Sequence, residues 1–180
     1  DSQMFLEEFD LPYRVVELDN AYTLLLTHFQ SYIKIEGSRG RLLRANIKPR
    51  LRMIALYYSA QVRNYLVLGT SNKSEISVGY STKYGDNAVD LQLLGDLLKT
   101  EVYELARYLK VPDYILEKAP SGGLWEGQTD EEEMGITYRE LDHYLATGQG
   151  EPHVVEKIEK MIKASEHKRQ MPPIPIIPRE

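Results

Sequence analysis

Hydrophobic residues along this chain recur either at helical spacing or in short segments. The segments Tyr13 to Glu17 and Tyr65 to Leu68 predict strands, and the second ends at Gly69-Thr70, which favours a strand buried on both faces. Helical spacing predicts helices that begin near Asp19, Asn46, Asp96, Thr137 and Pro152. Strands that alternate with helices predict an α/β domain with a mainly parallel sheet.

Polar residues mark the places where several of these helices begin. Asn46 has the side chain of an N-cap, which can accept a hydrogen bond from a free amide of the first turn. Two capping boxes follow later, Thr129 with Glu132 and Thr137 with Glu140. In such a box the hydroxyl and the carboxylate each satisfy a backbone amide, so each pair predicts a helix start.

The helix predicted from Asn46 to Arg63 has more apolar residues than one core-facing stripe needs. The stripe expected to face the core contains Leu51, Ile54, Ala55 and Tyr58. Further apolar residues on this helix are Met53, Leu56 and Tyr57, with Tyr58 on the border of both groups. A helix that is apolar on two faces predicts a second buried surface, such as a subunit interface.

Composition narrows the classes of function. The chain has 180 residues and a net charge of −5, which suits one domain and argues against a nucleic-acid binder, because phosphate contacts need an excess of cations. It has no cysteine, so disulfides, thiolate metal sites and cysteine nucleophiles are excluded within this chain. No apolar run approaches the ~20 residues of a membrane span. We therefore predict a soluble, cytoplasmic protein.

Two segments, Ser71 to Asp90 and Ala119 to Gln128, show no hydrophobic periodicity. Aperiodic segments of this length in a compact chain are typical of functional loops or of disorder. Both contain glycine and few apolar residues that could hold them in place. We predict that both are mobile without ligand and close over bound nucleotides, which would keep water from a reactive intermediate.

The strongest candidate chemistry follows the second predicted strand. Residues 69–75 combine hydroxyls, an amide, a cation and the carboxylate of Glu75. This composition suits a phosphate and magnesium site, because Mg²⁺ is held by one or two carboxylates together with substrate phosphates. The alternative is a solvated polar loop. Tyr80, Lys83, Tyr84 and Asp90 come next, and they would either stack a ring and bind phosphate or simply decorate the surface.

Other charged residues have ordinary structural explanations. Lys99 lies on a predicted helix, where most lysines are solvated. Arg50 and Arg52 are two apart and face different directions, so at most one can share a site with the other groups. His167 and Lys168 near the end of the last helix would favour its negative terminus.

Longer sequence motifs indicate a function more specifically than single residues do. The segment NIKPRLRM begins at Asn46. From there on, the motifs of the chain closely resemble those of the NAD synthetase family, both in their residues and in their order along the sequence. The other matching strings are VLGTSNKSE, GYSTKYGD, LLGDLLKTEVYELAR, PSGGLWEGQTDEEEMG and EHKRQMP. The resemblance implies a three-layer Rossmann-like fold, a parallel sheet flanked by helices of the adenine nucleotide α-hydrolase-like type, and a homodimer. It also implies a ligase that uses ATP to adenylylate the nicotinate carboxylate of deamido-NAD, after which ammonia displaces AMP.

The resemblance also assigns roles to individual residues. Glu75 is implied as the ligand of Mg²⁺, and the catalytic residues stay unknown. The implied ATP contacts are Thr70, Lys99 and Ser121, and the implied deamido-NAD contacts are Arg50, Lys83, Asp90, His167 and Lys168. These residues fall in the segments that composition alone marks as candidates.

One family feature does not occur in the sequence, the S-G-G-x-D-S loop whose amides cradle the ATP pyrophosphate. We therefore expect residues 1–180 to be a single NAD synthetase domain that is incomplete at its N-terminus. Ammonia dependence is predicted because the chain has neither a cysteine nor an amidase domain, and a separate glutaminase partner is compatible with this. Two alternatives stay open: a nucleotide-binding regulatory module without the pyrophosphate loop, and another ATP-pyrophosphatase amide ligase of the GMP-synthetase-like kind.

Overall fold

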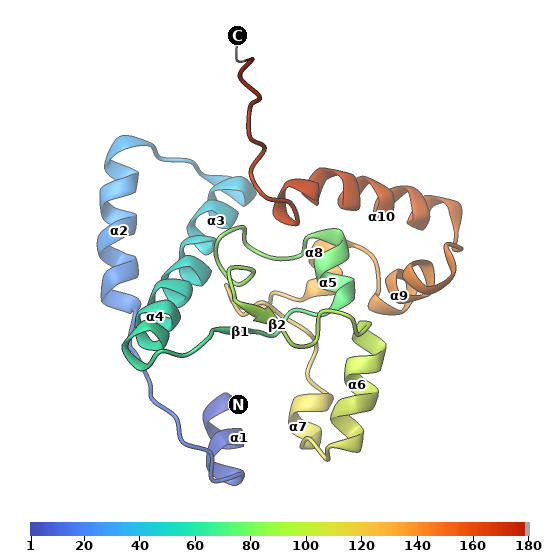
Figure 1. The fold of residues 1–180 in the computed structure, drawn as a ribbon, viewed down its shortest axis with the longest axis horizontal. Coiled ribbons are helices and arrows are strands. Elements are labelled where there is room, and N and C mark those ends of the chain that lie inside the picture. The colour runs from blue at the N-terminus through green and yellow to red at the C-terminus, as the bar shows by residue number, and fades with distance from the viewer. Residues whose placement is uncertain (179–180) are drawn as a thin grey trace.

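A short parallel sheet lies between two groups of helices (Figure 1). In this computed structural model, which describes residues 1–178, strand β1 (Leu68–Gly69) pairs with strand β2 (Leu91–Gln92) in parallel register, Leu68 opposite Leu91. Two parallel strands need a crossover connection, and helix α5 (Lys73–Val78) lies in it. The α/β class with a parallel sheet flanked by helices, predicted from the sequence, is confirmed.

The helices divide into groups on either side of this sheet. Helices α2, α3 and α4 lie on one side, and α8, α9 and α10 lie on the other, with α6 and α7 at the lower edge of Figure 1. The bounds are α1 Ser2–Glu8, α2 Asp19–Tyr32, α3 Gly37–Ala45, α4 Ile47–Arg63, α6 Lys99–Tyr108, α7 Asp113–Leu116, α8 Asp130–Met134, α9 Tyr138–Thr147, α10 Pro152–Ser165 and the 3-10 helix η1 Glu166–Lys168. Within residues 1–178, no helix is both long and apolar enough to cross a bilayer.

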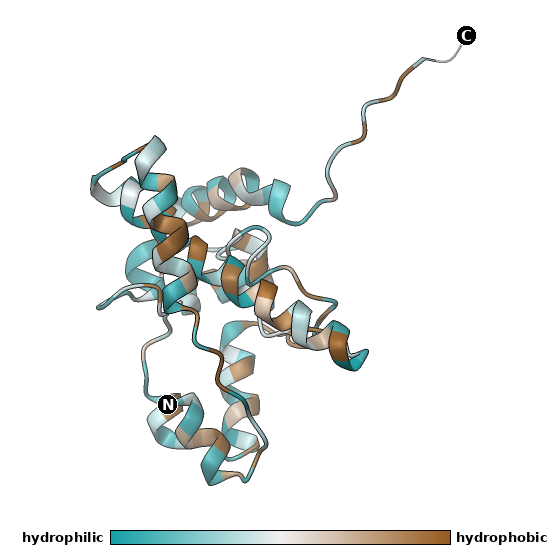
Figure 2. Ribbon diagram, turned by 90° about the vertical axis from the view of Figure 1, so that its left-hand side faces the viewer, coloured by the Kyte–Doolittle hydropathy of each residue, from teal (hydrophilic) through white to brown (hydrophobic). Residues whose placement is uncertain are grey.

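The hydrophobic core lies between α5, α8, α9 and α10, which contribute most of its residues. Leu141 and Ile158 are completely buried, and they pack in one cluster with Val78, Met134, Ile136, Tyr138 and Val154. Figure 2 shows hydrophobic and hydrophilic residues alternating along the helices, as amphipathic helices require. Burial of these side chains is the main stabilising contribution on this side of the molecule.

Most predicted helices are confirmed, and two strand predictions need correction. The capping box of Thr137 and Glu140 opens α9, whereas the Thr129 cap of α8 uses only the threonine half. The segment 13–17 is not a strand, because no neighbouring strand pairs with it within residues 1–178. The second predicted strand lies at Leu68–Gly69, later than the apolar run 65–68 suggests.

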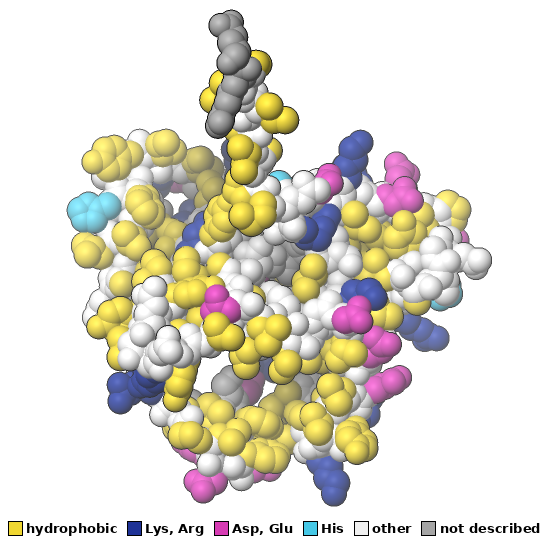
Figure 3. Space-filling view, in the orientation of Figure 1, with side chains coloured by type: hydrophobic (Ala, Val, Ile, Leu, Met, Phe, Trp, Pro, Cys, Tyr) yellow, Lys and Arg dark blue, Asp and Glu magenta, His cyan; other side chains and the backbone are white. Residues whose placement is uncertain are grey.

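Helix α4 also differs from its prediction. Its buried residues are Pro49, Leu51 and Ala60, whereas Ile54 and Tyr58 of the predicted core stripe are 58% and 71% exposed. The physical reason is that α4 packs mainly on α3 and α2, so much of its circumference stays open. Figure 3 shows hydrophobic side chains on this side of the surface.

Candidate active site

Glu75 occupies the third position of α5, directly beyond the end of β1. Its backbone amide donates to Asn72 Oδ1 over 3.0 Å, and its Oε2 accepts from the Asn72 amide over 3.1 Å. This reciprocal pair is a capping box, which fixes both the helix start and the direction of the carboxylate. The predicted aperiodic loop 71–90 therefore contains a capped helix, and its structureless character is corrected.

Lys99 meets Glu75 in a half-enclosed ion pair. Lys99 Nζ donates to Glu75 Oε1 over 2.9 Å, and the two side chains are only 17% and 15% exposed. The ammonium also lies 4.8 Å from the centre of the Tyr138 ring, within range of a cation–π contact. The structure thus joins two residues that lie 24 positions apart in sequence and that were both predicted for the ATP and metal site.

Tyr138 links this ion pair to a second carboxylate. Its hydroxyl lies 2.9 Å from Asp130 Oδ2 and 3.4 Å from Glu75 Oε1, and both Tyr138 and Asp130 are 4% exposed. Burial raises the pKa of Asp130, while the hydrogen bond from Tyr138 and the charge of Lys99 act in the opposite direction. Burial, together with the charges of both carboxylates, also raises the pKa of Tyr138, so this hydroxyl stays protonated.

A buried relay holds the start of α6, where Lys99 is the first helical residue. The Lys99 amide donates to Ser74 Oγ over 2.9 Å, the Ser74 hydroxyl donates to Asp142 Oδ1, and the Thr100 amide donates to Asp142 Oδ2 over 2.8 Å. Leu98 at the N-cap has no polar side-chain atom, so these amides depend on other helices for partners. The relay therefore couples the placement of Lys99 to that of Glu75, the neighbour of Ser74.

A second cluster collects three cationic or titratable side chains predicted to contact deamido-NAD. Arg50 at the start of α4 donates to the carbonyl of Lys83 from Nε and Nη2, over 3.3 and 3.1 Å. Lys83 Nζ lies 3.2 Å from His167 Nδ1. The cluster combines α4, the loop after α5 and η1, and it presents positive charge that suits an anionic ligand.

Lys168, next to His167, has an evident structural contact. Its ammonium donates to the carbonyls of Gly79 and Ser81, each over 2.6 Å. Burial lowers the pKa of Lys168, while the charge of Asp86 raises it. Gly79 has φ +66°, and a Cβ there would collide with the Cβ of Ser165. The loop after α5 is thus fastened to the last helix by this lysine and by close backbone approach.

Asp90 and Thr70 lie at the ends of the sheet. Asp90 Oδ2 accepts from the Val67 amide over 2.8 Å, and its Oδ1 accepts from the Tyr57 hydroxyl over 3.3 Å, so this carboxylate braces β1 against α4. Thr70 is exposed directly after β1. Ser121 is exposed too, and its Oγ accepts from the Gly123 amide over 3.1 Å. Within residues 1–178, no hydrogen bond links Thr70 or Ser121 to the ion pair.

Known proteins resemble this chain along nearly its whole length. A family model described as NAD synthase matches residues 1–172. The chain belongs to the NAD synthase family. The NH(3)-dependent NAD(+) synthetase of Syntrophomonas wolfei is 69% identical over 180 residues, which cover 100% of this chain and 72% of that protein. The same enzyme of Carboxydothermus hydrogenoformans is 49% identical, over 98% of this chain and 72% of that protein.

Solved structures agree with the family and the fold. The NMN synthetase from Francisella tularensis superposes with a TM-score of 0.88 at 40% identity, covering 96% of this chain and 70% of its own. The NH3-dependent NAD synthetase from Campylobacter jejuni, in complex with nitrate, gives a TM-score of 0.73 at 26% identity, over 98% and 70%. Membership of the NAD synthase family separates this chain from the GMP-synthetase-like alternative.

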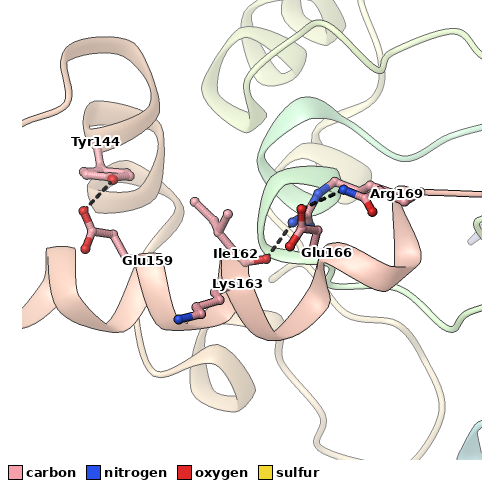
Figure 4. Close-up of a pocket in the computed structure, with 7 residues that line it drawn as sticks. Tyr144, Glu159, Ile162, Lys163, Glu166 and Arg169 are labelled. Atoms are coloured by element: carbon pink, nitrogen blue, oxygen red, sulfur yellow. Dashed lines mark hydrogen bonds between the residues drawn. The ribbon is translucent and has the colours of Figure 1, made fainter. Parts of the chain in front are cut away.

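Two hollows of this NAD synthase surface lie away from the ion pair. One, of about 390 Å³, is lined by α9, α10 and η1, where Tyr144 donates to Glu159 and Arg169 donates to the carbonyl of Ile162 (Figure 4). The other, of about 480 Å³, lies between α2, α3 and α4 and includes Arg50. At the ion pair itself, the ammonium of Lys99 and the carboxylate of Glu75 are in direct contact.

Sequence reasoning missed the buried partners of the site. Tyr138, Asp130, Ser74 and Asp142 lie on α5, α8 and α9 and become neighbours only in the fold. One signal was available: Asn72 and Glu75 have the same spacing as the threonine capping boxes that were recognised. The other hydrogen bonds join residues up to 68 positions apart, so no local sequence pattern predicts them.

Proposed function

We propose that this chain joins ammonia to the nicotinate carboxylate of deamido-NAD at the expense of ATP. The family consists of ligases that use ATP, and the curated relatives at 69% and 49% identity are named NH(3)-dependent NAD(+) synthetases. The carboxylate oxygen attacks the α-phosphorus of ATP and pyrophosphate leaves. The nitrogen of ammonia then attacks the acyl carbon, AMP leaves, and the nitrogen loses a proton.

The observation that carries the proposal is the enclosed pair of Lys99 and Glu75 at the end of β1. Ligands of parallel α/β sheets bind beyond the carboxyl ends of the strands, where this pair lies. Lys99 would supply a cation for phosphate oxygens, and Glu75 would supply a carboxylate ligand for a divalent ion. Fixed charges of this kind stabilise the charge that develops at the α-phosphate.

Mg²⁺ fits the residues that are present. Within the described chain no three acidic or histidine side chains gather as a complete metal cage. Mg²⁺ does not need one, because it is bound through one or two carboxylates together with phosphates and water. Glu75 is a suitable ligand, since its Oε2 is held by the Asn72 amide while its Oε1 faces Lys99. When bound, the ion would neutralise phosphate charge.

For deamido-NAD we propose the cluster of Arg50, Lys83 and His167. Its guanidinium, ammonium and imidazole lie in one place and suit the diphosphate and carboxylate of a dinucleotide. Lys168 and Asp90 act on the same site by holding the loop and the sheet end, and direct contact with the ligand is proposed for both. Thr70 and Ser121, both exposed, are proposed to meet ATP only once the nucleotide is bound.

We further propose a homodimer that buries α2 and α4, and a cytoplasmic location where ATP is supplied. On these two helices large apolar side chains are open to solvent, including Leu24, Phe29, Ile54, Tyr58 and Val62. A patch of this kind on a protein surface is typical of an interaction site. A separate glutaminase partner stays compatible with the proposal, since ammonia has to be supplied.

The test is incubation of the purified full-length protein, which includes any segment that carries the pyrophosphate loop, with deamido-NAD, ATP, Mg²⁺ and ammonium, followed by chromatographic detection of NAD and AMP. Equal amounts of NAD and AMP are expected. Release of ADP, or no NAD, would contradict the proposal. Nicotinate mononucleotide should be offered in parallel, because the Francisella structure at 40% identity is named an NMN synthetase. A strong preference for nicotinate mononucleotide would show that the mononucleotide, and not deamido-NAD, is the substrate.

A further inference from the structure

The ion pair at the proposed ATP site has a third participant that no assigned role covers. The ring of Tyr138 supports the Lys99 ammonium at 4.8 Å, and its hydroxyl lies between Asp130 and Glu75. Tyr138 is almost completely buried and is the first residue of α9, behind the Thr137 capping box. Its position is therefore fixed by the fold and does not depend on a ligand.

A single hydroxyl can donate only one hydrogen bond at a time. The shorter distance assigns it to Asp130 Oδ2, at 2.9 Å against 3.4 Å for Glu75 Oε1. The other Asp130 oxygen, Oδ1, is buried and finds no hydrogen-bond partner in the described part of the chain. Asp130 is consequently a carboxylate with unused acceptor capacity beside a lysine whose charge it already senses.

This arrangement creates competition for Lys99. Phosphate oxygens can recruit the ammonium only if the nearby carboxylates release it. Asp130 and Glu75 together carry two negative charges against one cation, and in a half-enclosed site such attractions are stronger than in water. The Tyr138 hydroxyl occupies one acceptor of Asp130 and stands between the two carboxylates, which weakens the hold of Asp130 on the lysine.

We propose that Tyr138 is a positioning residue of the ATP site, which keeps Lys99 available for phosphate by satisfying Asp130 and supporting the ammonium on its ring. The proposal rests on the proposed function only in taking Lys99 and Glu75 as the groups that meet Mg²⁺ and ATP. Tyr138 itself acts through Lys99, and Asp130 is the group that it restrains.

Tyr138→Phe tests this with little change of shape, because it keeps the ring and removes the hydroxyl. Without that hydroxyl, Asp130 draws Lys99 inward. We expect the dissociation constant of MgATP, measured by calorimetry, and the KM for ATP to rise about tenfold. The KM for deamido-NAD should change less than twofold, since no bond of Tyr138 reaches Arg50 or Lys83. Tyr144→Phe removes another tyrosine–carboxylate bond from α9 and is the matched control.

A second substitution separates positioning from mere stability. Asp130→Asn in the Tyr138→Phe background removes the competing charge, so affinity for MgATP should recover by at least threefold. A purely structural tyrosine would lower the melting temperature and both substrate affinities together, and adding Asp130→Asn would then bring no recovery.

Either of two results would overturn the proposal: unchanged MgATP binding in Tyr138→Phe, or equal loss for both substrates without recovery. Failure of the proposed function is distinguishable. In that case the wild type and Tyr144→Phe would bind MgATP but make no NAD, while the binding difference in Tyr138→Phe would persist.

Discussion

The two sides of the sheet are built differently. The α5 and α8–α10 side has completely buried apolar residues and buried polar side chains, among them Ser74, Asp142 and Asp130. The α2–α4 side has few buried residues, none of them in α2, and leaves large apolar side chains exposed. The first side can hold the side chains of the proposed site in fixed positions by itself, whereas the second leaves an apolar surface that another surface could cover.

The largest effect is expected in the buried core. Leu141→Ala removes a side chain with 0% exposure, and the cavity left behind should lower the free energy of unfolding by about 2–5 kcal/mol. Leu24→Ala on α2, where the side chain is 60% exposed, should change it by less than about 0.5 kcal/mol in a monomer. Denaturant titration of both variants measures the difference. Similar losses in both would mean that the two sides are equally packed.

A charge on α4 tests what the open side is for. Tyr58→Lys should weaken a homodimer by roughly 1–3 kcal/mol, because it places an ammonium in the proposed apolar interface. Light scattering at a series of concentrations should show dissociation at higher protein concentration than for the wild type. Tyr108→Lys on α6, where the tyrosine is 81% exposed, is the control and should leave assembly unchanged. A wild type that is monomeric and fully active at micromolar concentration would remove the interface altogether.

The smallest effect concerns the cap of α9, which places Tyr138. The Thr137 amide and hydroxyl donate to Glu140 Oε2 over 2.8 and 2.7 Å, and these bonds lower the pKa of Glu140 below its ordinary 4.5. Because the folded-state pKa is lowered, the stabilisation is complete above that ordinary value and is lost as pH falls through the folded-state pKa.

Glu140→Gln keeps the capping geometry and removes this titration. Since Glu140 is exposed, the expected loss near neutral pH is only about 0.5 kcal/mol, and the stability curve should become flatter in acid. Thermal unfolding from neutral pH down to about pH 3 measures it. The control is Glu132→Gln on α8, whose cap has only the threonine half. An unchanged acid limb in Glu140→Gln would show that the cap does not contribute.

The features that could be predicted from the sequence are those set by residues close together along the chain. Helix starts at Thr137 and Pro152 were predicted because capping and proline effects act within one turn. The exposure of Ile54 and Tyr58 could not be predicted, because hydrophobic periodicity shows that a helix face is apolar but does not show what covers it. Lys99 is an example from the candidate site. Its position on a helix predicts a solvated lysine, and only the family resemblance indicates a contact with ATP. The fold then supplied its partners, Glu75 and Tyr138.

The Ser74–Asp142 relay has a consequence for redesign of this protein. Each hydroxyl and carboxylate oxygen in it already has a partner, and one end of the chain of bonds is the backbone of Lys99 itself. Neither residue can therefore be exchanged by itself without leaving an amide or an oxygen unpaired in the interior. Libraries that aim to change nucleotide preference should vary the two positions jointly or leave both untouched.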